Sequence, residues 1–186
     1  MHRKKDKTHA HTSFVHCPLS MNEPLLLSSI VGGIFVILSY VYLYFDDDAE
    51  KAWGGIEGQW RMVWFLSTLL TTICYIFLWV SFVFFIEEQS MLLLTSWLIF
   101  LLSASQWSLL TLIDIKEQRK SIALLTNLIV TATASVGIWL VCMLLENHEA
   151  LRGWLIAASS IMVLHHAVAD AWLWYAAFPN LDFVPV

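Results

Sequence analysis

Three residues near the C-terminal end of the chain have the types and the spacing to do chemistry. His165, His166 and Asp170 lie in the otherwise largely apolar stretch 159–178, SSIMVLHHAVADAWLWYAAF. Residues four apart share one face of an α-helix, so His166 and Asp170 are predicted to stack, with His165 turned about 100° away. A carboxylate beside an imidazole orients the ring for proton transfer or for metal ligation.

Three interpretations of this group are open. Asp170 and the histidines can satisfy one another, or pair with the amides of Gln106 and Asn127, and so fix helix register. The same five residues can instead form a proton or cation path, since ionisable groups at membrane depth often mark such paths. His165, His166 and Asp170 are also the candidate metal ligands of a metal-dependent intramembrane enzyme, which normally needs three protein ligands.

The composition places the chain in a membrane. Of its 186 residues, 59% are hydrophobic and 13% are charged, and the mean hydropathy is +0.69. A soluble domain of this size is more polar. The net charge is −5, and basic residues cluster only in the N-terminal tail, which argues against a nucleic-acid partner.

Five apolar runs are long enough to cross a bilayer, because about 20 helical residues span a hydrocarbon core of roughly 30 Å. We therefore predict an all-α polytopic membrane bundle of about five transmembrane helices. The short polar connection at 87–90 predicts that the second and third helices form an antiparallel hairpin. The predicted spans are 25–45, 60–86, 91–113, 121–145 and 153–178.

Short tails flank this transmembrane domain of residues 25–178. Residues 1–24 lack periodicity and are predicted to be a disordered, basic tail near lipid headgroups. The tail is rich in histidine, so metal binding is the alternative. Met21 is an alternative start to Met1, and residues 179–186 are too short for a domain. The tail's candidate ligands are His2, His9, His11, His16 and Cys17.

Pairs of small residues four apart predict close helix packing. One pair is Thr133 and Gly137, and the other is Gly153 and Ala157. Lysine and arginine divide evenly between the two sides of a five-span topology, so the basic tail decides the orientation. It favours a cytoplasmic N-terminus under the positive-inside rule.

Motifs of known chemistry are missing from the sequence. The chain has no TVGYG filter, phosphate-binding glycine loop, HExxH or GxSxG pattern. We therefore expect a structural or accessory subunit of a membrane assembly, whose partners are the lipid bilayer and other membrane subunits. The alternatives are a proton or cation transporter using the His-Asp pair, and a metal-dependent intramembrane enzyme. Cofactor, oligomeric state and the membrane it occupies stay open.

Overall fold

The computed structural model describes residues 23–53, 56, 58–86, 90–146 and 148–177. The expectations for residues 1–22, 87–89 and 178–186 lie outside this part of the chain. Every regular element that the structure describes is helical, so the all-α prediction is confirmed. The elements are α1 (Glu23–Tyr44), η1 (Ala49–Trp53), α2 (Gly58–Phe84), α3 (Met91–Lys116), α4 (Ile122–Leu144), α5 (Glu149–Leu164), η2 (His165–Trp174) and α6 (Tyr175–Ala177).

Five helices have the length and apolar composition to span a membrane, as predicted. The fifth is a continuous rod of α5, η2 and α6 that covers Glu149–Ala177. It begins four residues before the expected residue 153. Glu149 lies in the first turn, where the positive end of the helix dipole stabilises an acidic side chain.

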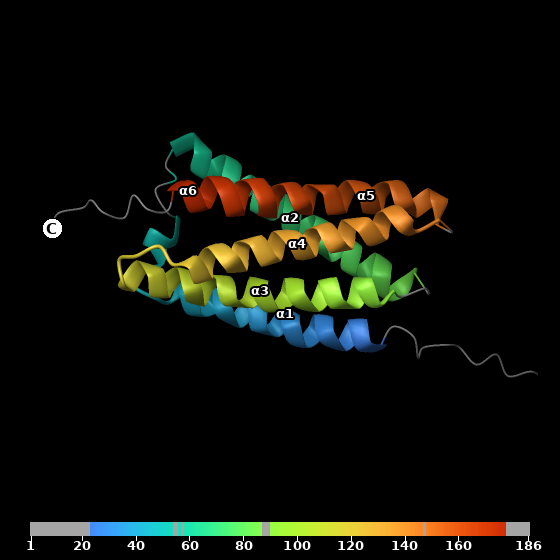
Figure 1. Ribbon diagram of the computed structural model, residues 1–186, viewed down its shortest axis with the longest axis horizontal. Coiled ribbons are helices and arrows are strands. Elements are labelled where there is room, and N and C mark those ends of the chain that lie inside the picture. Colours follow the sequence, from blue (N-terminus) through green and yellow to red (C-terminus); the bar gives the residue numbers. More distant parts are fainter. Residues whose placement is uncertain (1–22, 54–55, 57, 87–89, 147, 178–186) are drawn as a thin grey trace, which may run out of the picture.

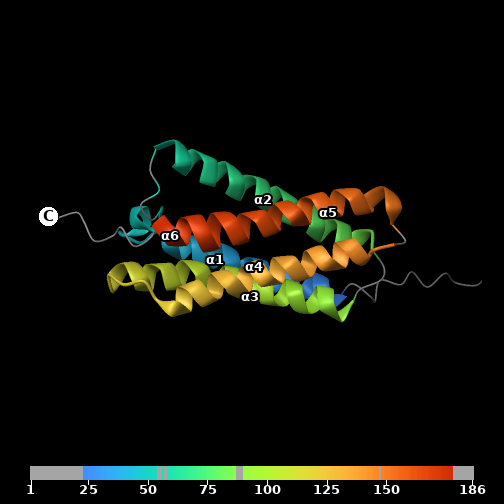
Figure 2. The same cartoon turned by 45° about the horizontal axis from the view of Figure 1, so that its top comes forward.

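Successive long helices run in alternating directions, so the described ends, in α1 and α6, lie at opposite ends of the bundle (Figure 1). Helix α3 packs between α1 and α4, and α5 packs against both α4 and α2. The predicted hairpin of α2 and α3 is only partly a pair of neighbours. Figure 2 shows α2 crossing toward α5 and standing apart from the bundle at its N-terminal end.

Aromatic side chains join α2 to α3 where the two helices do meet. The rings of Tyr75 and Trp97 stack with centroids 5.1 Å apart, and Phe82 meets Trp97 edge to face at 6.1 Å. Both arrangements are favourable for aromatic pairs. These contacts belong to a large apolar core that also includes Phe100. A second apolar core surrounds Trp174, the last residue of η2.

A buried carboxylate lies in the last turn of α3, where the sequence predicted a polar loop from residue 114. Asp114 is only 1% exposed, and its Oδ2 accepts a hydrogen bond from the backbone amide of Ser121 at 2.7 Å. Ser121 is the N-cap of α4, so the carboxylate satisfies a donor that the helix itself leaves unpaired. Helix α3 continues to Lys116, three residues beyond the predicted end at residue 113.

One of the four predicted packing residues lies at a close contact between helices. A Cβ added to Gly137 would overlap the side chain of Ser96, so α3 and α4 approach closely there. Thr133, Gly153 and Ala157 lie on the exposed surface of the bundle. A Cβ added to Gly153 would meet no atom within 4 Å, so no close helix approach occurs at that position.

Candidate metal-binding site

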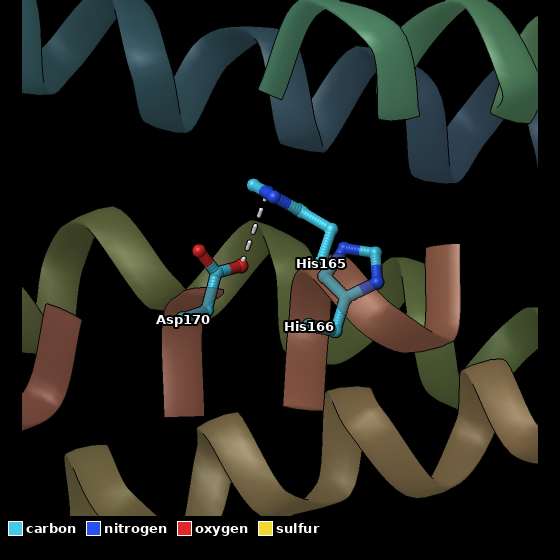
Figure 3. Close-up of side chains that lie close together, drawn as sticks. All are labelled: His165, His166 and Asp170. Atoms are coloured by element: carbon cyan, nitrogen blue, oxygen red, sulfur yellow. Dashed lines mark ion pairs between the residues drawn. The ribbon is translucent and has the colours of Figure 1, made fainter. Parts of the chain in front are cut away.

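His165, His166 and Asp170 gather inside the bundle, on η2. The two histidines are 6% and 9% exposed, and the side chain of Asp170 is 17% exposed. One possible ligand atom from each residue lies within 4.8 Å of the others. Figure 3 shows the His165 ring and the Asp170 carboxyl pointing toward one another, with the His166 ring beside them. We call these three residues the HHD cluster.

The winding of η2 brings the cluster together. Residues 165–174 form a π-helix, in which backbone hydrogen bonds join residues five apart. At its end, the amide of Tyr175 bonds to the carbonyl of Asp170. The side chain of His165, five residues before Asp170, contacts the Asp170 carboxyl with Nε2 and Oδ2 3.5 Å apart. The predicted stacking of His166 on Asp170 assumed an α-helix, and the π-helix replaces it with this five-residue contact.

A serine on α4 contacts one ring nitrogen of His166. The Ser135 hydroxyl lies 3.0 Å from the Thr131 carbonyl and 3.0 Å from Nδ1 of His166, and it can donate its single proton to only one of them. When the proton goes to Thr131, Nδ1 of His166 donates to Ser135 and Nε2 is the nitrogen that can bind a metal ion.

A second serine, on α2, contacts the other histidine. The hydroxyl of Ser67 lies 2.9 Å from Nδ1 of His165, which leaves Nε2 toward Asp170. The 3.5 Å between Nε2 and Oδ2 exceeds the usual length of such a hydrogen bond, about 2.7 to 3.2 Å. Each imidazole is therefore held by a hydroxyl at Nδ1, and the contact between His165 and Asp170 is loose.

All five long helices contribute to the surroundings of the cluster. The Trp64 indole of α2 interacts with the Asp170 carboxyl and also lies against the His165 ring, with centroids 6.2 Å apart. Tyr40 of α1 lies within electrostatic range of Asp170. Phe100 of α3 meets the His166 ring edge to face at 5.1 Å. The polar cluster is thus enclosed by aromatic side chains.

The two amides that the sequence grouped with the cluster lie elsewhere. Asn127 is buried, and its Nδ2 donates to the carbonyl of Ser103 at 2.9 Å. It joins α4 to α3. Gln106 is exposed on the surface of α3, so the partner expected for it on a neighbouring helix is not found among the described residues.

The sequence did not connect Ser67, Ser135, Trp64 or Tyr40 with the cluster. Serine, tryptophan and tyrosine are common in all five spans, and no spacing along the chain marks these four as facing η2. Finding them required the packing of α1, α2 and α4 around the histidines.

Comparisons with protein families, with curated proteins and with solved structures find no match to this chain.

Proposed function

We propose that this multi-pass membrane protein binds a divalent transition-metal ion at the HHD cluster. The observation that carries the proposal is the gathering of three ligand atoms within 4.8 Å inside a transmembrane helix. Nitrogen and oxygen ligands about 2.0 to 2.1 Å from a tetrahedral ion are roughly 3.4 Å apart. Nε2 of His165 and Oδ2 of Asp170 are 3.5 Å apart, so this pair already has ligand spacing.

The hydrogen bonds to the serines support the same function. Metal-binding histidines almost always use their second ring nitrogen in a hydrogen bond that fixes ring orientation and tautomer. Ser135 does this for His166, and Ser67 for His165. The widest pair of ligand atoms, within 4.8 Å of one another, has to close by up to about 1.4 Å to share one ion.

The donor set favours zinc over harder cations. Imidazole suits zinc, copper, iron and nickel, whereas calcium and magnesium prefer sites built from oxygen alone. Three protein ligands leave one tetrahedral position for water or substrate, as in catalytic zinc sites. The proposed centre therefore resembles sites that do chemistry more than sites that only hold a fold together.

The two other interpretations receive less support. The chain of contacts from Ser67 through the HHD cluster to Ser135 runs from α2 to α4. It therefore crosses the bundle and does not follow its long axis, which favours a binding site over a conduction path. A device that only packs helices satisfies its polar groups, whereas the His165–Asp170 contact is loose.

Zinc titration of the full chain in lipid nanodiscs tests the proposal. We expect one ion per chain, detected by calorimetry and by elemental analysis after gel filtration. Asp170→Asn and His166→Gln should each abolish binding at this site.

Two control variants separate the cluster from other histidines. His148→Gln alters a histidine at the start of α5, and a double variant replaces His9 and His11 of the N-terminal tail with glutamine. Both should keep the ion. If zinc binding survives Asp170→Asn and disappears in the tail variant, the HHD cluster is not the site.

A further inference from the structure

The winding of η2 decides whether the HHD cluster exists. In an α-helix five residues turn the chain by about 500°, so His165 and Asp170 would lie roughly 140° apart and be unable to share an ion. His166 alone would remain on the face of Asp170. The π-helix places both neighbouring histidines beside the carboxylate.

The winding needs an interaction that offsets its cost. π-helices are rare and appear mostly as single turns at functional sites, yet this one covers the ten residues His165–Trp174. An ion held by all three ligands binds the π form and not the α form. It therefore stabilises the π form by its own binding free energy.

The C-terminal end of η2 forms a hydrogen bond with η1. Trp174, the last residue of the π-helix, is 1% exposed. Its indole Nε1 donates to the carbonyl of Ala52 at 3.1 Å, and its ring lies 5.4 Å from that of Trp107. Ala52 belongs to η1, which follows α1 and precedes α2 along the chain. A change of winding that rotates Trp174 would displace η1.

We propose that the ion bound by the HHD cluster sets the winding of η2 and, through Trp174, the position of η1. The protein thus responds at one membrane face to an ion bound within the membrane. This inference rests on the proposed metal binding and adds a coupling between two places in the fold. The coupling requires a segment that can adopt two windings, an ion that binds only one of them, and the contact between Trp174 and Ala52.

Pulsed electron paramagnetic resonance on the full chain in nanodiscs tests the coupling. The native cysteines are replaced by serine, and nitroxide labels are attached at exposed positions. The pair Glu117→Cys and Ala176→Cys reports the end of η2, and the pair Glu50→Cys and Glu117→Cys reports η1. We expect zinc to shift both distance distributions and a chelator to reverse the shift.

Two variants identify the route. In Asp170→Asn neither label pair should respond to zinc. Trp174→Phe keeps the ligands and removes the indole donor, so the η2 pair should still shift and the η1 pair should not. A reference pair on α3 and α4, Leu102→Cys with Leu140→Cys, should stay constant.

The possible outcomes separate the two proposals. If zinc binds and neither pair moves, the coupling is wrong and the metal site stands. If the η1 pair still responds in Trp174→Phe, the route through Trp174 is wrong. If no zinc binds to the labelled or the native protein, both proposals fail.

Discussion

A single hydroxyl group on α4 holds one ring nitrogen of His166. Ser135 is fully buried, and its oxygen lies 3.0 Å from Nδ1 of His166, which leaves Nε2 as the nitrogen that can reach an ion. A short side chain on another helix therefore prepares the ligand. The carboxylate of Asp170 is held in place less firmly, because the distance between its Oδ2 and Nε2 of His165 is longer than a usual hydrogen bond.

The Ser135 contact leads to the first prediction. Ser135→Ala removes the hydroxyl that contacts Nδ1 of His166 and should weaken zinc binding about 10- to 100-fold, the usual effect of losing a hydrogen bond to a metal ligand. Competition with a chelator of known affinity measures the change. Ser103→Ala is the matched control, since the Ser103 hydroxyl bonds only to carbonyls of its own helix. Equal affinities in both variants would contradict the assigned role of Ser135.

Single residues also limit what sequence can predict. His165, His166 and Asp170 stand out because they are ionisable groups in an apolar run, and the structure does bring them together. The predicted stacking of His166 on Asp170 was wrong because it was derived from α-helical periodicity, and His165 makes the contact instead. Gln106 and Asn127 were grouped with them only because amides at depth need partners. Asn127 finds one in the backbone of α3.

At the scale of elements, the five apolar runs were predictable, whereas the end of α3, the start of α5 and the winding of the last helix were not. Five runs of sufficient length predict five helices. Nothing in the local composition of HHAVADAWLW distinguishes i→i+5 from i→i+4 hydrogen bonding, because apolar side chains suit both. The position of α2 was also not predictable from its short connection to α3, since a connection fixes where helices begin and not how they diverge.

The close approach of α3 and α4 gives the second prediction. Gly137→Val places side-chain atoms where Ser96 lies, and overpacking of this kind costs about 1 to 3 kcal/mol. Thermal unfolding in detergent should show a lower Tm than for the native chain. Gly33→Val is the control, because a Cβ at Gly33 meets no atom within 4 Å. A similar loss in both variants would show that helix propensity, and not the α3–α4 contact, is responsible.

An ion pair joins the ends of two other elements and gives the third prediction. Oδ2 of Asp46, just after α1, lies 2.6 Å from Nζ of Lys116 at the end of α3. The hydrogen bond from Lys116 holds the pKa of Asp46 below its usual value. Such a carboxylate stabilises the fold above its unfolded pKa of about 3.9, and the contribution disappears as pH falls through the lower folded pKa.

Asp46→Asn should therefore lower Tm slightly at about pH 7, and its difference from the native chain should shrink as the pH falls through the lowered folded pKa of Asp46. The effect is small because the pair is exposed to solvent. Asp47→Asn provides the control, since Asp47 is exposed and forms no ion pair within the described residues. A Tm difference that does not depend on pH would contradict the role of the ion pair.

At the scale of the whole molecule, the five spans and their alternating directions set a topology that can be tested. Residues of η1 and of the α3–α4 connection lie at one end of the bundle, and the α4–α5 connection lies at the other (Figure 1). The expected cytoplasmic N-terminus puts η1 on the outer side. The even distribution of lysine and arginine made this the least determined of the sequence predictions.

The fourth prediction fixes the orientation. Glu50→Cys in η1 and Glu146→Cys after α4 are both exposed, and each is introduced into a cysteine-free chain expressed in a bacterial plasma membrane. A membrane-impermeant maleimide should label Glu50→Cys in intact cells and Glu146→Cys only after permeabilisation. The reverse pattern would place the N-terminus outside.

The π-helix also has a consequence for the gene. The chain carries HHxxxD over residues 165–170, three codons between the second histidine and the aspartate. With one codon fewer, HHxxD, the histidines would precede the aspartate by four and three residues, and an ordinary α-helix would gather the same ligands. Insertion of one codon into such an ancestor would have forced the wider winding while keeping the ligand set. Distant relatives should therefore be sought with the shorter spacing as well as the longer one.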